Sequence, residues 1–221
     1  MLWAPRRLGW WVAVLFMAGS ACFATGAFTP FAAAAGARVA GVVFFIGSVF
    51  FTAAAYGQFV QSINDGGGAK RRLFAIVPRH RVWWAASVQL VGTLWFNVNT
   101  FDALRVGSSA HQQNFRVWTP DVLGSVCFLV ASFIALQAAS RGSIDHRIGV
   151  INMAGSVCFM AAAIAAFTLP RTDNYLDASL VNSGTFVGAL CFFWGARLLL
   201  VQLVPASPKR RNRDVHALTS P

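Results

Sequence analysis

The sequence predicts an all-α integral membrane protein, folded as a bundle of six transmembrane helices. Three observations predict it: six long apolar segments, basic residues gathered in the connections between them, and one short motif that recurs in every segment. The chain is 57% hydrophobic and only 11% charged, whereas soluble domains carry about 25% charged residues. A soluble core formed by 221 residues would leave much of this apolar surface in water, so we expect lipid to cover it.

A helix needs about 20 apolar residues to cross the hydrocarbon of a bilayer. Backbone groups in lipid must bond within their own segment, so runs of this length predict helices rather than strands. Around the spans we expect a transmembrane domain over residues 1–206, a basic loop at 61–81 and a basic, disordered tail at 207–221. The expected spans are Leu8–Phe28, Arg38–Val60, Val82–Phe101, Val117–Ala139, Arg147–Leu169 and Ala178–Val204.

The first segment also resembles a cleavable signal peptide. Arg6 and Arg7 precede its apolar stretch, and the small residues Ala24–Ala27 follow. Because the segment carries the same motif as the other five, we favour a retained helix.

Lys and Arg set the orientation of a membrane protein, because they accumulate on the cytoplasmic side. With the N-terminus inside, the cytoplasmic segments hold 13 basic residues and the outer segments hold four. We therefore expect a multi-pass protein of the plasma (inner) membrane with both termini in the cytoplasm. Its expected partners are membrane lipids, with anionic headgroups at the cytoplasmic face. We expect no nucleic acid partner, because the basic residues behind the net charge of +11 sit in short segments between the apolar runs.

The recurring motif is Gly-(Ser/Thr/Ala)-x-x-Phe, near the middle of every expected span. Gly and Phe four residues apart share one helix face. Glycine lets helix backbones approach closely, which is the main source of helix association in lipid, so we expect each glycine to receive a Phe of a neighbouring helix. Six copies predict internal duplication. They are Gly19–Phe23, Gly47–Phe51, Gly92–Phe96, Gly124–Phe128, Gly155–Phe159 and Gly188–Phe192.

The last span extends its motif backwards to Gly184, so Gly184 and Gly188 form a Gly-x-x-x-Gly pattern. Such a pattern packs within a bundle or joins two copies of a chain, and a homo-oligomer through these two glycines remains open. The cysteines take the position before the motif Phe, where other copies have Phe50 and Trp95. This interchange indicates apolar packing rather than disulfide, metal or redox chemistry. We expect no metal and no cofactor.

Polar residues within spans are the candidates for function. We expect them to line one polar pocket among the last four helices, or else to bond to neighbouring backbones as packing contacts. They are Gln89, Asn97, Asn99, Asp121, Asn152 and Thr185. Asp121 is the only acid among them. Thr119, Pro120 and Asp121 together also have the pattern of a helix start, which we favour over proton or cation coupling at Asp121.

Parts of residues 38–200 resemble the small YrhK-like membrane domain, whose hallmark is a Gly-Ser-x-x-Phe helix. The resemblance is carried by Phe45–Phe51, by Trp83–Phe101 and by Trp118–Ser125. This family is of uncharacterised function, so the resemblance implies a helical membrane protein and no catalytic residue.

No phosphate loop, nucleophile elbow or His-Glu-x-x-His pattern occurs in the chain. All four histidines fall outside the expected spans, which argues against haem held between two histidines. We therefore expect a non-enzymatic structural or accessory bundle. The alternative is a transporter or channel for small solutes or ions, which would use the polar faces of the third to sixth helices.

Overall fold

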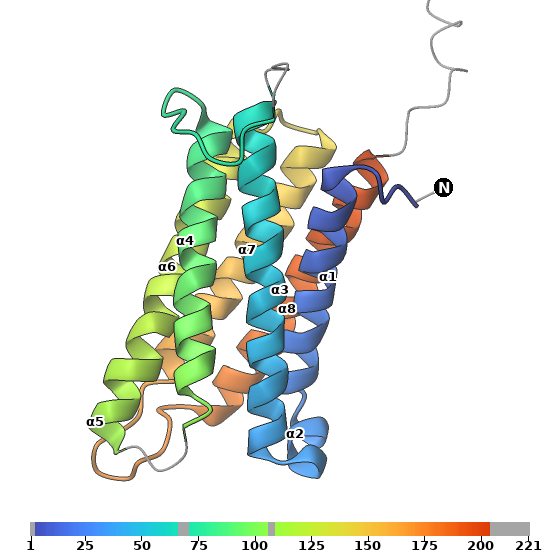
Figure 1. The fold of residues 1–221 in the computed structure, drawn as a ribbon. Helices are drawn as coiled ribbons and strands as arrows, with labels where there is room; N and C mark the ends of the chain where they lie inside the picture. Colours follow the sequence, from blue (N-terminus) through green and yellow to red (C-terminus); the bar gives the residue numbers. More distant parts are fainter. Residues whose placement is uncertain (1–2, 66–70, 106–108, 204–221) are drawn as a thin grey trace, which may run out of the picture.

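The computed structural model describes residues 3–65, 71–105 and 109–203, and the expected tail at 207–221 lies outside these residues. Within them the all-α prediction is confirmed. Two short helices, α2 (Thr29–Ala35) and α5 (Ala110–Gln113), accompany the long ones (Figure 1). The long helices are α1 (Leu8–Ala27), α3 (Ala37–Asn64), α4 (Arg81–Asp102), α6 (Thr119–Ala138), α7 (Ile144–Ala165) and α8 (Ala178–Gln202).

Five helices in the described residues are long and apolar enough to cross a membrane: α1, α3, α7, α8 and a continuous helix over Ala110–Ala138. This last helix joins α5, the π-helical turn η1 (Asn114–Trp118) and α6. The chain is thus a multi-pass helical membrane protein. Helix α4 is not among the five, because polar side chains interrupt its apolar sequence.

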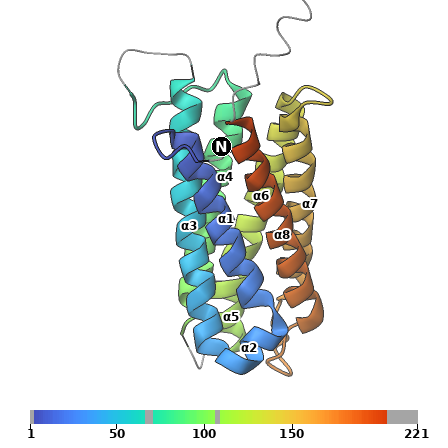
Figure 2. The ribbon, with the colours of Figure 1, turned by 90° about the vertical axis from the view of Figure 1, so that its right-hand side faces the viewer.

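The long helices form a closed ring in which each packs against two neighbours. The order around the ring is α1, α3, α4, α6, α7 and α8, and α8 returns to α1 (Figures 1 and 2). Neighbours run in opposite directions. The start of α1 and the end of α8 lie at one end of the bundle, which we call the terminal end. Helices α2 and α5 lie at the other, which we call the α2–α5 end.

Three hairpins make up this ring: α1 with α3, α4 with α6, and α7 with α8. In the first hairpin, a Cβ built on Gly19 would lie 2.6 Å from the ring of Phe51, and one on Gly47 would lie 2.9 Å from the ring of Phe23. Each glycine thus receives the Phe of its partner helix. The other hairpins repeat this reciprocal contact between Gly92 and Phe128, Gly124 and Phe96, Gly155 and Phe192, and Gly188 and Phe159.

The second and third motif positions also have the same degree of exposure in every copy. The second position is fully buried in every copy, at 0% exposure. The third position is exposed and apolar in every copy, as the face of a membrane helix toward lipid must be. The second-position residues are Ser20, Ser48, Thr93, Ser125, Ser156 and Ala189, and the third-position residues are Ala21, Val49, Leu94, Val126, Val157 and Leu190.

Hydroxyl pairs join two of the three seams between hairpins. Ser48 of α3 shares a hydrogen bond with Thr100 of α4, at 2.9 Å between their oxygens. Ser132 of α6 and Ser156 of α7 do the same at 2.9 Å. On the third seam, between α8 and α1, the buried Ser20 hydroxyl has no partner among the described residues.

The structure corrects two sequence predictions about helix ends. Helix α6 begins at Thr119, with Pro120 and Asp121 in its first turn, but Thr119 is not an N-cap. The π-helical turn η1 joins α6 to α5, which follows Ser109, whose hydroxyl accepts from the backbone N–H of Gln112. The hydroxyl of Thr119 instead donates to the carbonyl of Asn114 at 2.9 Å. Helix α7 starts at Ile144 and therefore includes His146, and His111 lies in α5. Both histidines are thus in helices that could cross a membrane, not outside the spans as predicted.

We expect Gly47→Ala to destabilise the protein, whereas Gly41→Ala on the same helix has little effect or stabilises it. The new Cβ at Gly47 would lie 2.8 Å from the Cβ of Cys22 and 3.1 Å from the carbonyl oxygen of Gly19. Neither atom can move aside easily, and such overpacking costs about 1–3 kcal/mol. At Gly41 the new Cβ meets only a terminal methyl of Leu104, which can rotate away.

Thermal unfolding of the purified protein in detergent measures both variants. A Gly41→Ala variant that loses as much stability as Gly47→Ala would contradict this account of the motif.

Candidate functional site

Six phenylalanines fill the centre of the bundle in two layers. Within each layer every ring contacts the other two at centroid distances of 5.6–6.2 Å. Between layers the two rings of each hairpin lie 5.0–5.5 Å apart. This Phe core closes the middle of the ring. The layer toward the α2–α5 end holds Phe23, Phe96 and Phe159, and the layer toward the terminal end holds Phe51, Phe128 and Phe192.

A cavity of about 160 Å³ lies on the α2–α5 side of the Phe core. Its floor is the layer of Phe23, Phe96 and Phe159. Its walls come from α3, α4, η1, α6, α7, α8 and the loop between α7 and α8. Most of the lining is apolar. The lining includes Phe44, Asn99, Trp118, Asp121, Tyr175 and Thr185.

Hydrogen bonds hold the α7–α8 loop over the cavity as one of its walls. The side chain of Asn114 donates to the carbonyl of Thr168 and accepts from its backbone N–H, each at 2.8 Å. The indole of Trp118 donates to the carbonyl of Ala163, at the end of α7. Within the loop, Thr168 and Tyr175 form an isolated antiparallel bridge. The ring of Tyr175 is thereby fixed beside the cavity.

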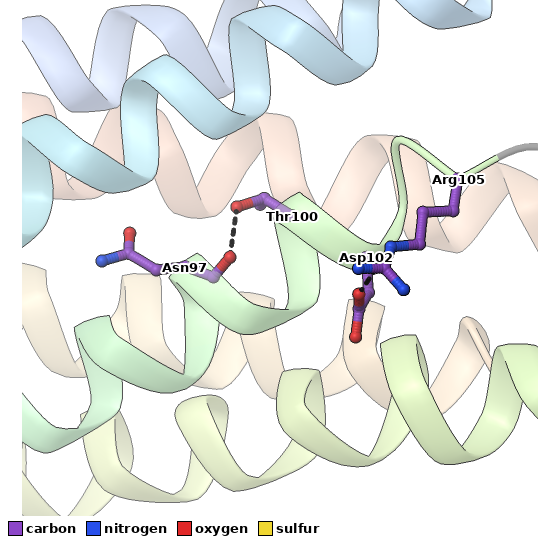
Figure 3. Close-up of polar contacts among 4 residues, drawn as sticks. All are labelled: Asn97, Thr100, Asp102 and Arg105. Atoms are coloured by element: carbon purple, nitrogen blue, oxygen red, sulfur yellow. Dashed lines mark hydrogen bonds and ion pairs between the residues drawn. The ribbon is translucent and has the colours of Figure 1, made fainter.

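Asp121 gives the cavity a carboxylate without a counter-charge. No Lys, Arg or His lines the cavity. The only ion pair among the described residues joins Arg105 to Asp102 at 3.3 Å, outside the cavity (Figure 3). Partial burial of the phenol, together with the negative charge of Asp121, raises the pKa of Tyr175 above its usual value. Asp121 and Tyr175 thus line the same cavity, and the charge of the carboxylate opposes ionisation of the phenol.

The six predicted polar residues do not form one pocket. Asn99, Asp121 and Thr185 line the cavity. Asn97 lies on another face of α4, where its amide donates to the hydroxyl of Thr52 at 2.9 Å. In Figure 3 this amide points away from Thr100, which bonds to the backbone of Asn97 instead.

The other two lie beyond the Phe core. Gln89 and Asn152 precede their motif glycines by one turn, and their helices run from the terminal end, so both lie on the terminal side of the core. Asn152 packs against Gly195 of α8. Sequence spacing alone treats all these positions as equivalent, because it ignores that alternate helices run in opposite directions.

Sequence reasoning missed Trp118 and Tyr175 as cavity residues. The sequence places Trp118 only near the start of the expected span Val117–Ala139. Tyr175 lies in a connection between spans, where no periodic pattern indicates its role. One signal was present: Tyr175 is one of only two tyrosines in the chain.

The cysteines and the Gly184–Gly188 pattern are part of the packing. Cβ atoms of Cys22, Cys127 and Cys191 lie against motif glycines of the partner helices. All four cysteines are free, and the described residues contain no group of three potential metal ligands. A Cβ on Gly184 would lie 2.9 Å from the carbonyl oxygen of Cys158, so this glycine packs α8 against α7.

No family model matches the chain, and neither does any curated protein or solved structure. The resemblance to the YrhK-like domain therefore stays a prediction.

We expect Asp121→Asn to lower the pKa of Tyr175. The negative charge of Asp121 opposes ionisation of the phenol, so its removal makes the phenol easier to ionise. In a Tyr56→Phe background Tyr175 is the only tyrosine, and the absorbance of tyrosinate on raising the pH reports its titration alone. Asp173→Asn is the control: it removes the same charge from the exposed loop that carries Tyr175, and we expect it to leave the pKa of Tyr175 unchanged. Equal midpoints in the Asp121 variant and its parent would show that the two groups do not interact.

Proposed function

We propose that this chain is a six-span membrane protein that acts as a closed, non-enzymatic accessory bundle with a small binding cavity on one side. The Phe core carries the proposal. It joins rings from all three hairpins at the middle of the bundle and leaves no room between its two layers for water. A permanently open channel is incompatible with this packing. A catalytic role finds no support, because no second acid, histidine, cysteine or lysine among the described residues lines the cavity with Asp121.

We infer that α4 is the sixth span. Its outward face carries a row of exposed apolar side chains, which soluble proteins rarely collect in one patch. Polar residues of α4 lie instead toward its neighbours: Asn97 bonds to α3 and Asn99 bonds to the carbonyl of Val117. The exposed residues are Val82, Trp84, Val91, Leu94, Trp95, Val98 and Phe101.

We infer further that the terminal end faces the cytoplasm. Basic residues predominate there, as the positive-inside rule requires. At the α2–α5 end charge is balanced, with four arginines (Arg38, Arg105, Arg116 and Arg171) and four aspartates (Asp102, Asp121, Asp173 and Asp177). The cavity then faces the outside.

Transport of a small solute is the second candidate, and one observation favours it: a carboxylate stands in a cavity that ends at the middle of the bundle. Transport would require the Phe core to open and expose the cavity to the terminal side. Access of one site from both sides of the membrane therefore separates the two proposals.

Single cysteines in a cysteine-free background, reconstituted in oriented vesicles, test the closed bundle. A membrane-impermeant thiol reagent added at the α2–α5 side should modify Thr185→Cys in the cavity. It should not modify Asn152→Cys beyond the Phe core. Asp173→Cys, in the exposed loop, reports which side the reagent reaches. Reaction of Asn152→Cys from the α2–α5 side, or of Thr185→Cys from the terminal side, would overturn the closed bundle in favour of transport.

The same reagent tests the sixth span. Arg72→Cys and Arg105→Cys lie near the two ends of α4, and both positions are exposed. If α4 crosses the membrane, the two thiols react from opposite sides. Reaction of both from one side would exclude α4 as a span.

A further inference from the structure

The cavity beside Asp121 has the chemistry of a site for a small positively charged organic ligand. Three features set its specificity: one unpaired carboxylate, aromatic surfaces on several sides, and a small fixed volume. None of them depends on whether the bundle transports a solute, so this inference goes beyond the function proposed above.

The charge is the first feature. An ionised carboxylate away from bulk water is costly unless it is paired and hydrogen-bonded. Among the described residues, no hydrogen-bond donor to Asp121 and no ion pair of Asp121 is present. Two of the polar side chains that line the cavity donate elsewhere: the amide of Asn99 to the carbonyl of Val117, and the hydroxyl of Thr100 to that of Phe96. A cation entering the cavity would supply the missing partner.

The aromatic lining is the second feature. Aromatic rings attract cations to their faces, and a group of rings is the usual means of holding an ammonium ion. Here the three floor rings, Phe44, Trp118 and Tyr175 surround the space beside Asp121. Divalent metal ions are poorly suited to it. Calcium takes six to eight oxygen ligands and magnesium a full octahedron, whereas the cavity holds a single carboxylate in a lining that is mostly apolar.

The size is the third feature. A cavity of about 150 Å³ accommodates a benzene molecule in another protein, and the cavity here has about 160 Å³. A ligand of about six non-hydrogen atoms therefore fits. The volume excludes most amino acids with large side chains and all nucleotides.

We propose that this cavity binds a small aliphatic monoammonium ion, with its nitrogen beside the Asp121 carboxylate and its alkyl part on the rings of the Phe core. The hydroxyls of Thr185 and Tyr175 are the further acceptors available to the ammonium hydrogens. The ammonium group belongs either to a free amine or to the headgroup of an ethanolamine lipid, since both present the same chemistry.

The test uses the full chain in nanodiscs of phosphatidylglycerol, a lipid without an amine. Isobutylammonium is the probe, and isobutanol is its neutral match in size. We expect isobutylammonium to raise the unfolding temperature in a saturable manner, because a ligand that binds only the folded state stabilises it. Isobutanol should have no comparable effect.

Two variants and a control locate the binding. Asp121→Asn should weaken isobutylammonium binding by about tenfold or more, which is the order expected for loss of a close charge pair. Ala166→Leu keeps the carboxylate but fills part of the cavity, and should also abolish binding. The control Asp173→Asn removes the same charge from the same end of the molecule and should bind as the parent does.

A second set of nanodiscs, containing phosphatidylethanolamine, distinguishes the sources of the ammonium. Stabilisation by this lipid alone that depends on Asp121 assigns the site to a headgroup, and its absence assigns it to a free amine. Three outcomes would overturn the proposal: equal stabilisation by isobutanol, unaltered binding in Asp121→Asn and Ala166→Leu, or no binding of isobutylammonium to the folded parent in either nanodisc.

Discussion

The reciprocal contact between glycine and phenylalanine within each hairpin is the constraint on which the rest of the structure depends. In lipid no hydrophobic force drives helices together, so close backbone approach and good ring packing must supply the association. Each motif glycine leaves room for the Phe ring of the partner helix. Because Gly and Phe are four residues apart on one helix face, the Phe rings also point toward the centre of the bundle. Once three hairpins share this contact, their six rings meet as the Phe core, and the ring of helices closes around it.

This dependence explains why so much of the fold was predictable from the sequence. The helices, their approximate bounds and the glycines that receive rings follow from the length of apolar runs and from one short motif. The position of Asp121 in the first turn of α6 was also readable. The N-cap role assigned to Thr119 was wrong, because a π-helical turn continues the helix from Thr119 back to Ala110. No local pattern of residues distinguishes such a turn from a break.

The site was only partly predictable, for a reason of geometry. Phe44, Asp121 and Thr185 hold the same place relative to their motif glycines, and so do Phe16, Gln89 and Asn152. The first three lie on helices that run toward the terminal end, and the second three on helices that run away from it. Residues one turn before the glycine therefore divide between the two sides of the Phe core. The three hairpins present Phe, Asp and Thr to the cavity, and this difference among otherwise similar units gives the cavity its single charge. Tyr175 and Trp118 reach it through loop contacts that act over long sequence separations.

The seam between α8 and α1 also bears on how the protein is assembled. It joins α8 to α1, and the hydroxyl of Ser20 forms no hydrogen bond across it. Its polar link is at the terminal end, where the guanidinium of Arg7 donates to the carbonyl of Leu203 at 2.8 Å. Helices inserted one after another during synthesis can form the first two hairpins early, but α1 waits for its second neighbour until α8 has entered the membrane. Until then the face of α1 that carries Ser20 lacks the helix that covers it in the folded bundle. Closure of the ring of helices therefore depends on α8 reaching α1.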